Sequence, residues 1–222
     1  MRPPAPAPSK SDLPRLQAAS ERLVADLSRV FAEQVRRALG VDLDHSVTSL
    51  AYVDYYLAQA REETREPILS LLAAGAAAYF GELVCRTIGG GWLGDGARAT
   101  SLRVLLGPQP IYFSPFAMAL EAIVGEAIDP GDPRAPADAP VDSAFHFASG
   151  DDGEDARWLS EALANFAPVP EDHYHSLTCR FETLELILEL LAGQQQARGC
   201  EPRTYTLDDY VAAFAEAADR PS

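Results

Sequence analysis

The sequence predicts an α+β fold, in which a mainly helical single domain packs on a small antiparallel sheet of short strands. Apolar residues recur at helical spacing through most of the chain. Two short stretches rich in β-branched and aromatic residues, 101–106 and 110–113, interrupt that spacing and are separated by a Gly-Pro-Gln turn. At 222 residues, of which 47% are apolar and 23% charged, the chain is long enough for one packed core.

The first ten residues, MRPPAPAPSK, contain four prolines and are predicted to be a disordered tail, which leaves residues 11–222 for the folded domain. The tail has no apolar run typical of a signal peptide. The longest uncharged apolar run, residues 67–81, is shorter than the roughly 20 residues that cross a bilayer. Three widely spaced cysteines indicate no disulfide framework. We therefore expect a cytoplasmic protein with no membrane partner.

Helical spacing predicts a first helix over residues 12–39, with Gly40 as its stop. Asp44 or Ser46 is placed to cap a second helix. A third helix is predicted over residues 67–88, because proline suits the first turn of a helix. The core face of the second helix consists of Leu50, Val53 and Leu57.

The third helix carries a ridge of small residues at every fourth position. Such a ridge predicts the close approach of another backbone, because nothing projects between the two axes. Gly75 and Gly81 each cost roughly 1 kcal/mol of helix propensity, which tertiary packing must offset. Glu82 and Arg86 lie one turn apart and are expected to pair. The ridge consists of Ala73, Ala77, Gly81 and Cys85.

The glycine triplet 89–91 is expected to end this helix. It is not a phosphate-binding loop, since it lacks the lysine of that motif and follows a helix instead of opening one. Trp92 and Leu93 are candidates for a third strand beside the hairpin. Ser114, which precedes a proline, predicts the start of another helix that continues to Val124.

The last third of the chain begins with a proline-rich loop over residues 129–141, inside the domain. Residues 145–147 are a further candidate strand. A strongly amphipathic helix is predicted over residues 176–191, with Gly193 as its stop. A variant of the capping box at residues 206–209 predicts the start of the last helix.

The charge is distributed unevenly along the chain, whose net charge is −15. Residues 1–111 carry 12 basic and 12 acidic side chains, whereas residues 112–222 carry 6 basic and 21 acidic ones. Nucleic-acid binding requires basic residues that neutralise phosphates, so we expect no nucleic-acid partner. An acidic surface favours either solubility alone or association with a basic protein.

Three glutamates of helix 176–191 are the candidate partner-binding residues. Glu182, Glu185 and Glu189 share one face at turn spacing, apart from the apolar stripe. Their mutual repulsion amounts to a few tenths of a kcal/mol per pair, which a solvated face tolerates. The pattern is consistent with a plain solvated face and with a surface for a basic partner.

The residues Glu-Asp-His-Tyr-His at 171–175 are the one pattern that resembles a metal or catalytic site. In an extended segment, His173 and His175 point to the same side, about 7 Å apart, and can share a metal ion. No HExxH or paired-cysteine pattern supplies further ligands, and no GxSxG motif supplies a nucleophile. We therefore expect no cofactor, and a metal-dependent hydrolase using these two histidines is the alternative function.

Residues 41–126 contain, in order, the stretches VDLDHSVTSLAYVDYYL, AAYFGELVCRTIGGGW, LRVLLG and IYFSPFAMALEAI. With its motifs YFGE at 79–82 and GGW at 90–92, this order resembles a broad group of poorly characterised bacterial α+β proteins. Some members of that group look like immunity proteins of bacterial toxin systems. The resemblance implies a non-enzymatic binding role and supplies no catalytic residue.

The sequence thus predicts a non-enzymatic protein that associates with another protein through its acidic C-terminal half. An immunity protein is the sharpest form of this prediction, and an accessory or regulatory subunit is a looser form.

Overall fold

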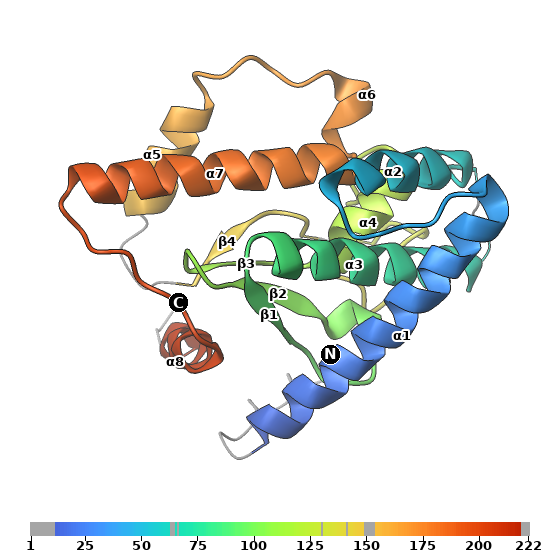
Figure 1. The fold of residues 1–222 in the computed structure, drawn as a ribbon, viewed down its shortest axis with the longest axis horizontal. Helices are drawn as coiled ribbons and strands as arrows, with labels where there is room; N and C mark the ends of the chain where they lie inside the picture. The colour runs from blue at the N-terminus through green and yellow to red at the C-terminus, as the bar shows by residue number, and fades with distance from the viewer. Residues whose placement is uncertain are drawn as a thin grey trace.

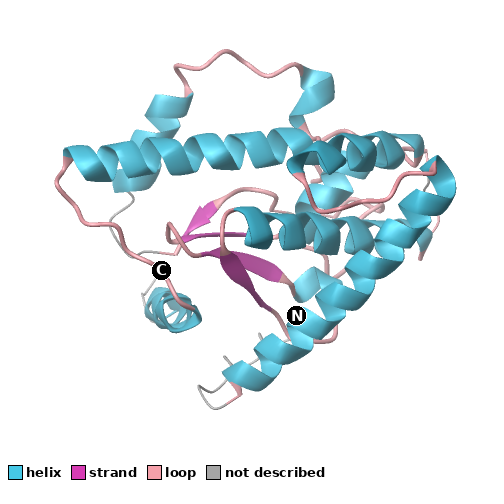
Figure 2. Ribbon diagram, viewed as in Figure 1, coloured by secondary structure: helices cyan, strands magenta, loops and turns pink. Residues whose placement is uncertain are grey.

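The chain folds as a mainly helical α+β domain in the computed structural model, which confirms the predicted fold class (Figures 1 and 2). The structure describes residues 12–62, 65, 67–129, 131–140, 142–148 and 154–218, so the predicted disordered tail lies outside the described residues. The α-helices are α1 (Leu13–Leu39), α2 (Leu50–Gln59), α3 (Ile68–Thr87), α4 (Pro115–Val124), α5 (Glu154–Leu163), α6 (Glu171–Tyr174), α7 (Leu177–Ala197) and α8 (Leu207–Ala218). The strands are β1 (Gly90–Leu93), β2 (Arg103–Leu106), β3 (Ile111–Phe113) and β4 (His146–Phe147).

The strands form one antiparallel sheet in the order β1-β2-β3-β4, which includes both of the additional strands suggested by the sequence. Trp92 pairs with Val104, and Leu105 pairs with Tyr112. Because side chains alternate along a strand, these two pairs lie on opposite faces of the sheet. The indole of Trp92 contacts α3, whereas Tyr112 packs against Phe214 of α8. The sheet therefore lies between α3 and α8.

Helix α3 is the central core helix, and it packs mainly against α1 and α4. Its two glycines make room for aromatic side chains. A Cβ at Gly75 would lie 2.9 Å from the Cβ of Phe31, and one at Gly81 would lie 2.6 Å from Cζ2 of Trp92. The expected close approach of another backbone is therefore wrong at Gly81, since an indole from the sheet fills the space instead.

By length and composition, α3 is the one described helix that could cross a membrane, but most of it is buried inside the fold. Core helices of soluble proteins share this property. Of the glycine triplet that follows it, Gly89 adopts the left-handed conformation with φ of 96°, and the other two glycines belong to β1. The triplet thus ends the helix and also begins the sheet.

Helix α7 is longer than the sequence predicts, because it passes through Gly193 and ends at Ala197. Gly193 is exposed, and the residues that follow it include three glutamines and an alanine, which favour helix. The prediction that Gly193 stops the helix is wrong, and the glycine with a left-handed conformation beyond the end of α7 is Gly199, with φ of 71°. The cost of one glycine is therefore smaller than the gain from an additional turn of helix.

The N-terminus of α7 is held by a carboxylate from α2. Asp54 accepts hydrogen bonds from the backbone N–H groups of Leu177 (2.8 Å) and Thr178 (3.0 Å), while Ser176 caps the same helix through Cys179 N–H (3.0 Å). Burial raises the pKa of Asp54, and the hydrogen bonds from Thr178 and Leu177 act in the opposite direction. This contact holds the start of α7 against α2.

Helix α8 is anchored to the sheet by one buried tyrosine. The Tyr210 hydroxyl lies within hydrogen-bond distance of three carbonyl oxygens around the β2–β3 turn, those of Leu106 (2.8 Å), Gln109 (3.0 Å) and Ile111 (2.8 Å). The predicted capping box is also present, since Thr206 N–H donates to Asp209 (2.8 Å). Burial raises the pKa of Tyr210 above its usual range, so the hydroxyl stays protonated and donates.

Replacement of Tyr210 by phenylalanine is expected to destabilise the protein by about 1–3 kcal/mol, because it removes the α8 hydroxyl that lies among three buried carbonyls. Chemical denaturation of the two proteins measures the difference. Tyr205→Phe is the matched control, since the Tyr205 side chain is only partly buried. Equal losses for the two variants would contradict the assigned anchor.

Candidate functional site

A groove of about 910 Å³ runs beside α7 and contains two of the three predicted partner-binding residues. One wall is a face of α7, the second is the segment 200–204 that leaves its C-terminal end, and the base comes from the end of α3 and the β2–β3 turn. Figure 1 shows this segment descending from α7 to α8. We call it the α7 groove; its lining residues are Ile88, Pro108, Gln109, Glu185, Leu188, Glu189, Ala192, Gln195, Gln196, Cys200, Pro202, Arg203 and Thr204.

The walls of the α7 groove are tied together by hydrogen bonds at its base. The side-chain amides of Gln109 and Gln195 exchange two hydrogen bonds, of 3.0 and 2.9 Å. Cys200 N–H donates to the carbonyl of Gln195 (2.9 Å), and Tyr205 N–H donates to that of Gly107 (2.8 Å). These bonds connect α7, the β2–β3 turn and the segment 200–204, so the groove has a defined shape.

The chemistry of the α7 groove combines apolar contact with negative charge. Ile88, Pro108 and Leu188 supply apolar surface, and the exposed carboxylates of Glu185 and Glu189 lie on the α7 wall. Glu182, one turn closer to the start of α7, is exposed but lies outside the lining residues. The structure thus places two of the three predicted residues in one groove. The residues of the opposite wall carried no signal in the sequence, because their position depends on the distant contact between Tyr205 and Gly107.

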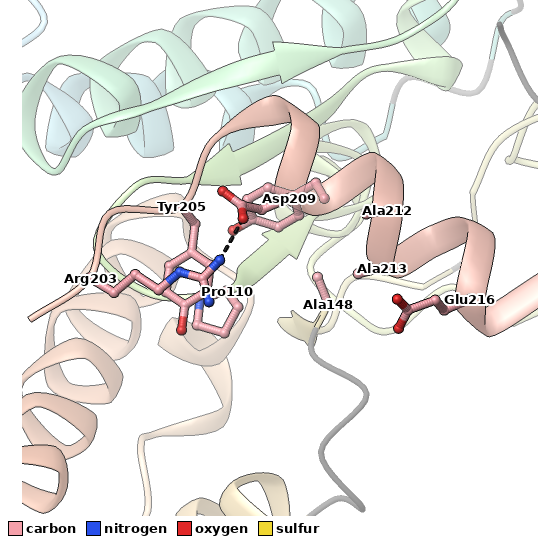
Figure 3. Close-up of a pocket in the computed structure, with 9 residues that line it drawn as sticks. Pro110, Ala148, Arg203, Tyr205, Asp209, Ala212, Ala213 and Glu216 are labelled. Atoms are coloured by element: carbon pink, nitrogen blue, oxygen red, sulfur yellow. Dashed lines mark hydrogen bonds and ion pairs between the residues drawn. The ribbon is translucent and has the colours of Figure 1, made fainter. Parts of the chain in front are cut away.

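A smaller hollow of about 280 Å³ shares Arg203 with the α7 groove and is lined by α8 from Asp209 to Glu216 (Figure 3). Arg203 lines both. Its guanidinium lies over the ring of Tyr205, 5.0 Å from the centroid, and pairs with Asp209 at 2.5 Å. The hydrogen bond from Thr206 lowers the pKa of Asp209, which keeps that carboxylate charged. The exposed Glu216, like Asp209, belongs to α8, and Figure 3 shows it farther along that helix from Arg203.

His173 and His175 do not have the extended geometry that the metal hypothesis required. Residues 171–174 form the short helix α6, because Pro170 starts a turn whose carbonyl accepts from His173 N–H. The His173 side chain is exposed, whereas that of His175 is mostly buried and its Nδ1 lies 3.3 Å from a carboxylate oxygen of Glu121. Among the described residues, no group of three or more His, Cys, Asp and Glu is arranged to hold a metal ion.

Glu121 belongs to a buried charged cluster that sequence reasoning missed. Its Oε2 accepts a 2.6 Å hydrogen bond from the Arg180 guanidinium, which also donates to Ser143 (3.3 Å) and lies over the ring of Tyr174, 5.3 Å from its centroid. The side chains of Glu121 and Arg180 are only 6% and 12% exposed. The sequence signal that could have indicated this cluster is the single carboxylate, Glu121, within the otherwise apolar helix α4. Through these contacts the cluster joins α4, α6 and α7.

The structure also brings together a serine and a histidine that are distant in sequence. Ser28 Oγ lies 3.2 Å from Nε2 of His45, and His45 N–H donates to the hydroxyl of Tyr79 (2.8 Å). Burial lowers the pKa of His45, which keeps its imidazole neutral. The serine side chain is buried within α1, and the nearby Asp44 accepts a hydrogen bond from Ser46 N–H (2.9 Å). These contacts fix the α1–α2 connection against α3.

A second large hollow, of about 1010 Å³, lies between α1, α2 and the start of α3. Ile68 and Leu71 on its rim are 43% and 61% exposed, so it is the main apolar competitor to the α7 groove as a contact surface.

No protein-family model, curated protein or solved structure matches this chain. The resemblance seen in residues 41–126 therefore rests on its sequence motifs.

Proposed function

We propose that this chain is a non-enzymatic binding protein that associates with a basic partner protein through the α7 groove. The observation that supports this proposal best is the presence of Glu185 and Glu189 on the wall of a groove that Ile88, Pro108 and Leu188 also line. Charged side chains at the rim of an interface steer association and select the partner, while apolar surface contributes affinity. The α7 groove contains charged side chains and apolar surface together.

The uneven charge of the chain supports the same proposal. The C-terminal half holds 21 acidic and 6 basic residues, and the groove is built largely from that half. Such a surface attracts basic proteins and repels nucleic acids. Neutralisation of a basic toxin, as the sequence resemblance implies, is the sharpest form of the proposal, and an accessory subunit is the looser form. No observation favours the metal-dependent hydrolase, so we do not propose it.

Charge reversal in the groove is the direct test. The full chain is used to isolate its partner from cells of the source organism, and the affinity of the purified pair is then measured. Glu185→Lys/Glu189→Lys is expected to weaken binding by about tenfold or more, because attraction becomes repulsion. Rising salt is expected to weaken the wild-type complex, since it screens exposed charges.

The matched control is Glu21→Lys/Asp26→Lys on α1, which changes the net charge equally at two exposed positions outside the groove. We expect this control to keep affinity within about twofold of the wild type, because neither residue lines the groove and salt screens exposed charges that do not contact the partner. Equal weakening by both double variants would show a non-specific charge effect and would contradict the proposed site.

A further inference from the structure

We propose that the partner's contact is an extended segment carrying two basic side chains at alternate positions, which lies along the α7 groove with those side chains at Glu185 and Glu189. This inference rests on the proposed function and specifies the ligand of the same groove.

The spacing of the two carboxylates favours an extended ligand. Glu185 and Glu189 are four residues apart on α7, which places their backbones about 6 Å apart along the helix axis at 1.5 Å per residue. In an extended chain, side chains on the same side are two residues apart and therefore separated by about 6.6 Å. A basic residue, any residue and a second basic residue thus match the two glutamates in register. Two basic residues that are adjacent in an extended chain point to opposite sides, so only one of them can reach a glutamate of the groove.

The length of the groove suits a short segment. Its α7 lining extends from Glu185 to Gln196, about 16 Å at the helical rise. This distance equals about five residues of extended chain. Leu188 and Ala192 lie between the acidic end and the end near Cys200, so an apolar ligand residue is expected there. A peptide of that length is too short to form a stable helix in water.

The opposite wall offers free backbone groups. Within the described part of the chain, residues 201–204 make no backbone–backbone hydrogen bond, and all four are exposed; Pro202 has only a carbonyl to offer, so the available N–H groups are those of the other three. An extended ligand satisfies such groups by pairing with them, as when a peptide adds to a strand edge.

The two glutamates give the groove a direction. They precede the C-terminal end of α7 by two turns or more, whereas Arg203, in the segment that follows that end, already pairs with Asp209. The exposed carboxylates of the α7 wall all lie at the first of these two ends, so the basic residues of the ligand belong there. The opposite end of the ligand, near Cys200 and Arg203, takes uncharged residues.

Cys200 permits a direct test in the full-length chain. It is exposed and lines the groove, whereas Cys179 is buried and burial raises the pKa of the Cys85 thiol to about 12. The probe is the peptide acetyl-Cys-Gly-Leu-Arg-Ala-Lys-amide, together with its reversed sequence because the groove allows either chain direction. Each is equilibrated with the protein in a buffer of 2-mercaptoethanol and its disulfide. Mass spectrometry measures the mixed disulfide, and peptide mapping assigns it to Cys200.

In the better of the two chain directions, the mixed disulfide is expected to form with an equilibrium constant about tenfold higher than for the same peptide with Glu and Asp as its charged residues. The isomer with adjacent Arg and Lys is expected to lose about half of that preference in free energy, or about threefold in the constant. Glu185→Gln/Glu189→Gln is expected to remove the preference, and the matched control Glu21→Gln/Asp26→Asn to keep it.

Three results would overturn the inference: no preference for the basic peptides, a preference that survives in Glu185→Gln/Glu189→Gln, or equal binding of the adjacent and alternating isomers. Each of these results can occur even if the proposed function, binding of a basic partner through the α7 groove, is correct. A partner complex that is sensitive to Glu185→Lys/Glu189→Lys, combined with no tethering preference, would show a folded partner surface in the groove instead of an extended segment.

Discussion

Replacement of Arg180 by methionine is expected to destabilise the protein by about 3–5 kcal/mol, the largest effect of any single substitution considered for this fold. The reason is that the substitution leaves the buried carboxylate of Glu121 without its guanidinium partner. Glu121 is only 6% exposed, and the 2.6 Å hydrogen bond from Arg180 is its shortest polar contact. Without the guanidinium, its charge has only the weaker contact with His175 at 3.3 Å. Urea or thermal unfolding measures the loss.

The double variant Glu121→Leu/Arg180→Met separates the loss of an ion pair from the loss of packing. Replacing both members of a buried pair by apolar residues is often neutral or stabilising, so the double variant is expected to recover most of the lost stability. A double variant that is as unstable as Arg180→Met would show that packing around Arg180, and not the unpaired carboxylate, is responsible. A loss below about 1 kcal/mol for Arg180→Met would contradict the buried-pair account.

Substitution of Gly81 by alanine is expected to have the second-largest effect, a loss of about 1–3 kcal/mol or somewhat more. The added Cβ would lie 2.6 Å from Cζ2 of Trp92 and 2.9 Å from Cγ2 of Val104, so the indole and β2 must shift. Both neighbours are buried side chains in the core between α3 and the sheet, where little free space exists. Thermal unfolding followed by Trp fluorescence reports both the stability and the environment of the indole.

Gly193→Ala is the matched control, because it makes the same chemical change in an exposed helical position. A Cβ there meets no atom within 4 Å. We expect this variant to be more stable by about 0.5–1 kcal/mol, through helix propensity alone. If both variants were stabilised, the packing of Trp92 on Gly81 would be wrong.

Local patterns in the sequence were sufficient for most of the elements. The period of apolar residues identified α1, α3 and α4, and the Gly-Pro-Gln turn identified the hairpin of β2 and β3. The same periodicity placed Glu185 and Glu189 on the exposed face of α7, where the structure has them. These features depend on contacts between neighbours in the chain, which a single sequence displays.

Features that depend on distant contacts could not be predicted in the same way. The partners Glu121 and Arg180 are 59 residues apart, and the carboxylate of Asp54 that holds the start of α7 is 123 residues from Leu177. The second wall of the α7 groove is likewise set by the hydrogen bond between Tyr205 and Gly107. Only the unusual position of a glutamate within the apolar helix α4 signalled any of this in the sequence.

The two incorrect local predictions have a common cause. Gly193 has the pattern of a helix stop, and the metal hypothesis took residues 171–175 as an extended segment; each assignment rests on only a few residues. In the structure, the residues after Gly193 continue the helix, and Pro170 starts the turn of α6. Neighbouring residues and tertiary contacts outweighed the local preference in both cases.

Site-specific photo-cross-linking in cells of the source organism tests the central claim, that the partner docks in the α7 groove, most directly. A photoreactive amino acid is placed at the exposed groove residue Ala192 or, as the comparison, at the exposed Leu71 beside the hollow of α1, α2 and α3. We expect a partner adduct from position 192 that is absent in the Glu185→Lys/Glu189→Lys background, and none from position 71. An adduct from position 71 alone would contradict the account and place the contact on the opposite, helical corner of the fold.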